Sequence, residues 1–207
     1  MDREDRKSHW ERAYESKQAT ELSWYQARPE RSLELIRRAG AHSRSEIIDV
    51  GGGDSMLVDA LLESGMKHIT VLDISAAALD RARERLGLRS AGVRWIEADV
   101  TSAQLAPLAY DVWHDRAVFH FLTNPDDRRR YLDVIGGALN VGGHAIVATF
   151  SADGPTRCSG LAVERYSPFA LHAEFGNEFD LVDSSEETHV TPSGKNQNFI
   201  YCLCRKR

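Results

Sequence analysis

Residues 46–55 read EIIDVGGGDS, a short β-branched run that ends in three consecutive glycines and an aspartate. Glycine has no side chain and adopts left-handed backbone conformations, so a glycine turn after a strand lets the backbone approach a ligand closely. Three classes of ligand use turns of this kind: a phosphate, a dinucleotide, and a nucleoside that carries no phosphate. The neighbouring residues decide among the three.

The residues of the turn argue against phosphate groups. A phosphate-binding loop ends in Lys followed by Ser or Thr, whereas Gly53 is followed by Asp-Ser-Met. A dinucleotide fingerprint that starts at Gly51 would need a glycine at Met56. Asp49 and Asp54 flank the turn, and carboxylates repel a pyrophosphate but favour an amine or a sulfonium. The turn therefore favours a cationic or zwitterionic nucleoside.

The rest of the chain repeats the pattern of a strand followed by a helix. Four further strand-like runs cover 68–75, 93–100, 109–115 and 144–150. Helix-like stretches cover 55–64, 76–87 and 125–143. Strands that alternate with helices predict parallel βαβ units, and the last two runs, 179–190 and 196–207, predict an antiparallel hairpin at the sheet edge. The expected fold is α/β, doubly wound, with a mostly parallel seven-stranded sheet, helices on both faces and this C-terminal hairpin.

The segment before the first strand is expected to be helical. Residues 1–45 contain two helical pieces, near 3–17 and 29–39, which are separated by ATELSWYQARP. We expect an N-terminal helical arm or lid at 1–45, followed by one ligand-binding domain at 46–207. The 207 residues suit a single compact domain overall.

Composition excludes several functional classes. The net charge of −5 disfavours a nucleic-acid partner, which normally meets a basic surface. No apolar run approaches the ~18 residues that a membrane helix needs, and the polar N-terminus does not resemble a signal peptide. Three cysteines without a disulfide pattern indicate a cytoplasmic protein, and Cys202 and Cys204 indicate strand packing, with no metal site.

Two acidic residues follow the next two predicted strands. Asp73 stands 20 positions after Gly53, where an acidic side chain accepts hydrogen bonds from ribose hydroxyls, and Asp99 is placed to accept from an adenine amino group. Each residue alone is better explained as a helix N-cap. Their joint position at the carboxyl ends of successive strands, where open α/β sheets bind ligands, favours a binding site.

Five motifs in order carry a resemblance to a known family. DVGGGDS (49–55), VLDIS (71–75), EADV (97–100), YDVWHD (110–115) and LNVGGH (139–144) resemble the class I S-adenosylmethionine-dependent methyltransferases over about residues 45–207. Ser55 stands where the family often has a third glycine. The N-terminal HWERAYESKQATELSWYQ resembles small bacterial members.

The resemblance implies a cofactor, S-adenosyl-L-methionine, which becomes S-adenosyl-L-homocysteine when its methyl group is transferred. The residues implied for the cofactor are Asp49, Gly51 and Gly53 around its methionine part and ribose, Asp73 on the ribose, Ile74 against the adenine, Asp99 and Val100 on the adenine edge, and Asp115. The transfer itself is an in-line displacement, for which the protein mainly positions the acceptor and excludes water.

Residues after the fourth predicted strand are candidates for catalysis. A general base is needed only when the acceptor must lose a proton, and His120 and Asp115 are the candidates. His120 could instead pack between its phenylalanine neighbours, and Asp115 could instead pair with Arg116. We expect Trp24, Tyr25, Arg116, His120 and Cys158 to line the acceptor pocket.

The size of the chain favours a small-molecule acceptor. A protein lysine N-methyltransferase is the first alternative, although HDRAVF replaces the Asn/Asp-Pro-Pro-Tyr/Phe motif that such enzymes usually carry. A non-catalytic S-adenosylmethionine-binding module is the second alternative. A nicotinamide oxidoreductase is disfavoured by Met56 and by the acidic residues of the turn. The acceptor atom and the oligomeric state do not follow from the sequence.

Overall fold

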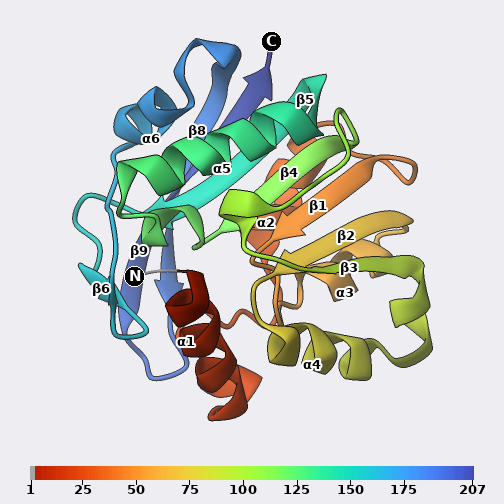
Figure 1. Ribbon diagram of the computed structural model, residues 1–207, viewed down its shortest axis with the longest axis vertical. Helices are drawn as coiled ribbons and strands as arrows, with labels where there is room; N and C mark the ends of the chain where they lie inside the picture. The colour runs from red at the N-terminus through yellow and green to blue at the C-terminus, as the bar shows by residue number, and fades with distance from the viewer. Residues whose placement is uncertain (1–2) are drawn as a thin grey trace.

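Strands that are buried on both faces build the centre of the protein. The computed structural model describes residues 3–207, and Figure 1 shows a twisted sheet flanked by helices. The strands are β1 (Glu46–Val50), β2 (His68–Asp73), β3 (Val93–Glu97), β4 (Tyr110–Arg116), β5 (Leu139–Phe150), β8 (Phe179–Val190) and β9 (Asn196–Lys206). Their order in the sheet is β3-β2-β1-β4-β5-β9-β8. This arrangement confirms the predicted seven-stranded, mostly parallel sheet.

Helices cover both faces of the sheet, as predicted (Figure 1). The helices are α1 (Arg3–Glu15), α2 (Glu30–Arg38), α3 (Leu57–Glu63), α4 (Ala76–Leu86), α5 (Pro125–Ala138) and α6 (Pro168–Phe175). Neighbouring residues of one strand enter different cores: Ile47 packs with α2 and α3, whereas Ile48 packs with α5 and α6. Among residues 3–207, no helix is both long and apolar enough to span a bilayer.

The C-terminal hairpin places one strand inside the sheet. β9 pairs with β5 on one side and with β8 on the other, antiparallel to both. Of the two hairpin strands, only β8 therefore lies at a sheet edge, and β3 forms the opposite edge. The insertion brings Gln197 and Phe199 of β9 to the end of the sheet where β4 finishes, and this position becomes important for the site below.

One predicted boundary is wrong. The helix expected over 125–143 ends at Ala138, and β5 begins at Leu139, five residues before the strand that the sequence indicated. The competing interaction is sheet pairing, because Leu139 pairs with Tyr110 of β4 and the amide of Ala109 donates to the carbonyl of Ala138 at 2.8 Å. The register then shifts before Val112 pairs with His144.

The N-terminal arm is fastened to the carboxyl ends of the strands by charge. Glu11 of α1 accepts hydrogen bonds from the amides of Ala76 and Ala77, at 2.9 and 3.1 Å, and so caps the N-terminus of α4. Arg6 of α1 reaches Asp99 at 2.9 Å and Asp127 at 2.8 Å. These contacts hold α1 beside α4, as Figure 1 shows.

Candidate cofactor and acceptor site

The turn after β1 requires glycine for two reasons. Gly51 has a φ of +66° and Gly53 a φ of +43°, which are left-handed conformations that other residues adopt at a cost. A Cβ atom on Gly51 would overlap Cγ2 of Val118, and one on Gly53 would lie 2.7 Å from the Tyr14 hydroxyl. The amide of Gly51 donates to the Leu72 carbonyl at 2.7 Å, which fixes the turn against β2.

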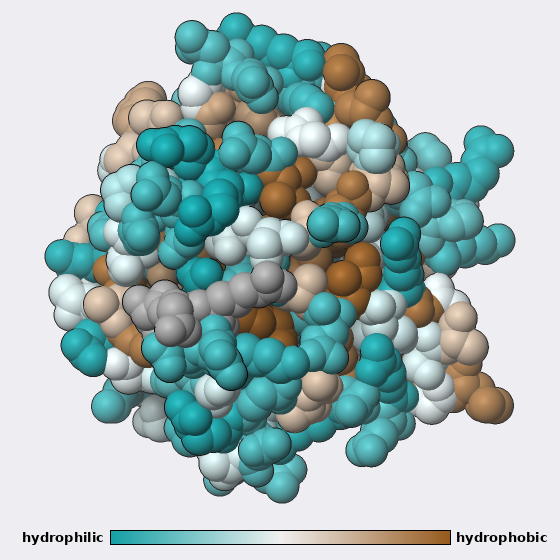
Figure 2. Space-filling model, viewed as in Figure 1, coloured by the Kyte–Doolittle hydropathy of each residue, from teal (hydrophilic) through white to brown (hydrophobic). Residues whose placement is uncertain are grey.

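A cavity opens above this turn, between the strand ends and the N-terminal arm. The space between its walls is about 860 Å³, part of which is open to solvent. It is lined by predicted site residues from six segments of the chain: Trp24, Gly51, Asp73, Ile74, Asp99, Val100, Arg116 and Cys158. On the face that Figure 2 shows, hydrophobic residues gather near the middle and hydrophilic residues surround them.

A second cavity adjoins the first along the glycine turn. It is lined by two further predicted residues, Asp49 and Tyr25, and shares Gly51, Trp24 and Arg116 with the first cavity. The two cavities therefore form one continuous site that runs from Asp99, across the glycine turn, to the end of β4. Gly53 lies beneath this site, where a side chain would reach Tyr14 and Asp73.

Asp73 and Asp99 each use one carboxylate oxygen in a local turn, and the other oxygen of Asp99 pairs with Arg6 at 2.9 Å. Oδ1 of Asp73 accepts from the amide of Ser75 at 2.9 Å, and Oδ1 of Asp99 accepts from the amide of Thr101 at 2.9 Å. Both residues thus serve the local turn, as the capping explanation predicts, and both also line the cavity. Burial raises the pKa of Asp73 to about 7.

Asp49 belongs to a buried chain of polar groups. Its Oδ1 lies 2.7 Å from Nδ1 of His114, and Nε2 of His114 lies 2.8 Å from the Ser32 hydroxyl. The sequence analysis missed His114 and Ser32 as neighbours of Asp49. The signal for His114 lies in the sheet register, because Asp49 of β1 and His114 of β4 are direct partners.

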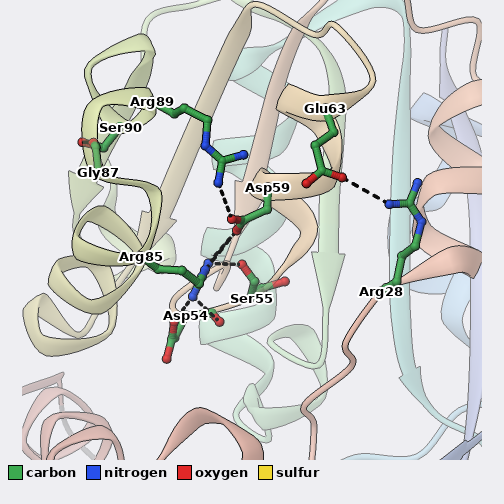
Figure 3. Close-up of polar contacts among 9 residues, drawn as sticks. All are labelled: Arg28, Asp54, Ser55, Asp59, Glu63, Arg85, Gly87, Arg89 and Ser90. Carbon is green, nitrogen blue, oxygen red and sulfur yellow. Dashed lines mark hydrogen bonds and ion pairs between the residues drawn. The ribbon is translucent and has the colours of Figure 1, made fainter.

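Asp54 lines the second cavity, and its carboxylate is also held by helix α4. Arg85 of α4 binds its carboxylate, and Arg81 lies 4.0 Å away. Arg85 also reaches Asp59 at 2.9 Å, so the acidic residues after the turn are neutralised by α4 (Figure 3). Arg85 thus offsets the charge of Asp54, while Asp73 and Asp99 line the first cavity and Asp49 and Asp54 line the second.

Asp115 is not at the reacting end of the site. Its carboxylate is fully buried and accepts from the amide of Val118 at 2.9 Å and from the Tyr131 hydroxyl at 2.8 Å. Burial raises the pKa of Asp115 to about 7. It lines neither cavity and makes no ion pair with Arg116, because adjacent strand residues point to opposite faces. Asp115 instead shapes the loop that presents Val118 to Gly51.

His120 lies behind the cavity wall. Its ring packs 4.5 Å from Phe121 and 4.6 Å from Phe150, measured between ring centroids, and it has no exposed surface. The amide of Phe150 donates to its Nδ1 at 3.3 Å. Burial lowers the pKa of His120 to about 3. The structure thus agrees with the packing explanation and does not bring His120 to the lining.

Aromatic residues of the arm cover the site. Trp10 of α1 packs edge-on against Phe121, with ring centroids 5.0 Å apart, and against Trp24 at 5.7 Å. Tyr14 is fully buried beside Trp24 at 6.0 Å. Trp10 and Tyr14 escaped the sequence analysis, because in α1 they looked like ordinary helix residues. That the arm opens as a lid stays a prediction.

Cys158 lines the first cavity and does not act as a nucleophile. It lies in the β6–β7 hairpin (Arg157–Cys158 and Leu161–Ala162) and is buried, which raises its pKa to about 11. A thiol with that pKa stays protonated at neutral pH, so Cys158 contributes apolar surface.

Comparison with known proteins identifies this arrangement. The family model described as a methyltransferase domain matches residues 48–145. An uncharacterized methyltransferase of Mycobacterium tuberculosis is 35% identical over 104 residues, which are 50% of each chain. The eEF1A lysine and N-terminal methyltransferase of Danio rerio is 24% identical over 183 residues, 86% of this chain and 26% of its own. This chain thus spans about half the length, or less, of these curated relatives.

A solved structure shows the same fold over nearly the whole chain. Burkholderia thailandensis 1,6-didemethyltoxoflavin-N1-methyltransferase, crystallised with 1,6-didemethyltoxoflavin and S-adenosylhomocysteine, has a TM-score of 0.69 at 20% identity, and covers 99% of this chain and 86% of its own. The family model and the mycobacterial relative thus match about half of this chain to methyltransferases, and the solved structure shows that nearly the whole chain has the fold of a methyltransferase that binds S-adenosylhomocysteine.

Proposed function

We propose that this protein transfers the methyl group of S-adenosylmethionine to a small-molecule acceptor. The observation that carries the proposal is the continuous site between the strand ends and the N-terminal arm. It runs from Asp73 and Asp99, past the glycine turn, to an aromatic chamber at the end of β4. The same site thus has one end suited to a nucleoside and another suited to an apolar acceptor.

The residues present fit the cofactor. The backbone of Gly51 lines the cavity directly, and Asp73 and Asp99 supply buried carboxylates for hydroxyl and amino donors. Ile74 and Val100 add apolar surface for a flat base. When bound there, the cofactor supplies a methyl group already activated by a sulfonium.

The chain's own contribution is to position the acceptor and to exclude water. Holding two reactants in line can lower the activation barrier by on the order of 7–11 kcal/mol. Trp10, Tyr14 and Trp24 close the site on the arm side, and Phe121 and Phe150 close it on the sheet side. Neither His120 nor Asp115 reaches the lining, so transfer proceeds without them as a base.

Two observations bear on the acceptor. The aromatic cover leaves a chamber that is only partly open to solvent, which suits a small molecule, and the fold neighbour described above was crystallised with 1,6-didemethyltoxoflavin. The alternative is a lysine side chain, favoured by the similarity to the eEF1A methyltransferase at 24% identity. The charges at the acceptor end, described below, argue for the first.

The test is an assay of S-adenosylhomocysteine release. Acceptors would include small thiols, phenols and amines, with purified eEF1A as the protein substrate and the Gly51→Ala variant as the inactive control. We expect release with at least one small molecule and none above background with eEF1A. Binding of NAD but not of S-adenosylmethionine in calorimetry would overturn the proposal as a whole.

Replacing His120 with phenylalanine is expected to leave the rate of methyl transfer in a single turnover within about two-fold of the wild type. The ring already packs among phenylalanines, and its pKa of about 3 keeps it neutral at every working pH. The rate should therefore show no inflection near pH 6.5, the ordinary pKa of histidine. A rapid-quench measurement with saturating cofactor tests this, and a ten-fold slower step with unchanged cofactor affinity would restore His120 as a candidate base.

A further inference from the structure

Arg116 is a buried cation at the acceptor end whose donors are not all used. Its side chain is 9% exposed, and it lines both cavities. Its Nε donates to the Tyr201 hydroxyl at 3.0 Å, and its Nη1 donates to the Trp24 carbonyl at 3.2 Å. Its Nη2 is buried and has no hydrogen-bond partner. A buried charged donor without an acceptor is costly and rare, which points to a ligand.

The nearest carboxylate does not satisfy Arg116. Oε2 of Glu187 lies 3.9 Å from Nη2, beyond hydrogen-bond distance, and is already the acceptor for the Tyr201 hydroxyl at 2.8 Å. Oε1 of Glu187 accepts from Gln26 at 3.3 Å. Glu187 therefore orients Arg116 through Tyr201 and partly offsets its positive charge. Nη2 stays available to donate a hydrogen bond to a ligand.

The other walls of this chamber are mostly apolar, with Gln197 of β9 as a further polar residue on the lining. Phe121, Phe150 and Cys158 line it, and the carboxylates on the lining, Asp73 and Asp99, lie at the nucleoside end. The guanidinium of Arg116 covers the ring of Phe199 at 4.3 Å, so that ring face is closed to a second cation. An ammonium such as a lysine side chain would therefore meet a positive charge here with no carboxylate to bind it.

We propose that the acceptor is a small apolar molecule of the thiol class that reacts as its anion, paired with Nη2 of Arg116. This inference rests on the proposed methyl transfer. A neighbouring cation lowers the pKa of a thiol from about 8.5, so the thiolate forms without a protein base. The proton passes to solvent, the thiolate electron pair forms the bond to the methyl carbon, and the bond from that carbon to the sulfonium breaks.

The first experiment measures anion binding without turnover. Calorimetry on the complex of the protein with S-adenosylhomocysteine would compare benzoate, benzamide and benzylamine, which share a ring and differ in charge. We expect benzoate to bind at least about ten-fold more tightly than benzamide, and benzylamine not to bind detectably. A charge-assisted hydrogen bond is worth about 10- to 100-fold in affinity. Equal affinities for benzoate and benzamide would overturn the inference.

Substitutions of Arg116 and of Glu187 are expected to change the affinity for benzoate in opposite directions. Arg116→Met should weaken benzoate binding about 10- to 100-fold, and Arg116→Lys should restore part of it. Glu187→Gln should strengthen benzoate binding, because it removes the charge that opposes the anion. A purely structural role of this cluster would instead weaken binding in all the variants, and that result would contradict us. Unchanged affinity for S-adenosylhomocysteine would show that each variant is folded.

The alternative to an acceptor anion is that Arg116 binds the carboxylate of the cofactor's amino-acid group. Arg116→Met would then weaken binding of S-adenosylhomocysteine but not of 5′-methylthioadenosine, which lacks the amino-acid group, and that outcome overturns the inference. Failure of S-adenosylhomocysteine to bind the wild type would instead overturn the proposed function.

A second experiment measures methyl transfer to two reactive probes, thiophenol and aniline. We expect methyl transfer to thiophenol alone, and equal rates would count against a thiolate acceptor.

Discussion

Replacing Asp73 with alanine is expected to weaken the binding of S-adenosylhomocysteine about 10- to 100-fold, because hydrogen bonds from a ligand to a charged group are worth about 1.5–3 kcal/mol. The carboxylate is buried at the end of β2, and its Oδ2 points toward the glycine turn. Calorimetry at pH 8 measures the effect. Asp80→Ala, an exposed position on α4, is the matched control and should leave the affinity unchanged. An unchanged dissociation constant for Asp73→Ala would remove this residue from the site.

The pH dependence gives Asp73 a second, independent signature. Burial raises its pKa from the usual 3.8 to about 7 in the folded protein. The protonated carboxyl of Asp73 therefore stabilises the folded protein fully below about pH 4. This stabilisation is lost as the pH rises through about 7. Without cofactor, Asp73→Asn should be more stable than the wild type at pH 8, as thermal unfolding would show. The wild type should bind the cofactor more tightly as the pH rises through 7, and Asp73→Asn should lose this dependence.

The nucleoside end of the site could be predicted because its signals are local. Gly51, Asp73 and Asp99 each lie at or just after the carboxyl end of a strand. Parallel strands in an open α/β sheet end at one edge, so a residue that ends a strand is placed by the fold alone. No knowledge of side-chain packing was needed to expect these residues near one another, and the structure brings them to one cavity.

The residues at the acceptor end of the site could not be predicted from local sequence patterns. Phe199 and Tyr201 arrive there only because β9 inserts next to β5, and Trp10 arrives because Glu11 fastens α1 to α4. Contacts between such distant parts of the chain have no local pattern. Arg116 was expected in the pocket, but its unused Nη2 depends on the distance to Glu187, which only packing sets.

One error could have been avoided from the sequence. Asp115 and Arg116 are neighbours on β4, and successive strand residues point to opposite faces. If Arg116 faces the acceptor, Asp115 must face the core with α5, where Tyr131 binds it. An ion pair between the two and a shared place at the reacting atoms were both incompatible with that alternation.

Gly51→Ala is expected to lower kcat/KM for methyl transfer on the order of 100-fold, the loss that about 1 Å of misplacement can cause. The φ of +66° at this position costs a non-glycine residue about 1–2 kcal/mol. The added Cβ would also overlap Cγ2 of Val118, which must move and carry the loop after β4 with it. Steady-state kinetics and the thermal shift produced by S-adenosylhomocysteine measure the two effects.

Gly65→Ala separates backbone strain from damage to the site. Gly65 follows α3 with a φ of +83°, but a Cβ there meets no atom within 4 Å. The two substitutions therefore share the cost of a left-handed alanine, about 2–8 °C in Tm for a chain of this size. Only Gly51→Ala adds an overlap with Val118 and places a methyl group in the cofactor cavity. Gly65→Ala should thus keep the wild-type affinity for S-adenosylhomocysteine, and if Gly51→Ala kept it too, the glycine turn would be a structural turn and not a cofactor cradle.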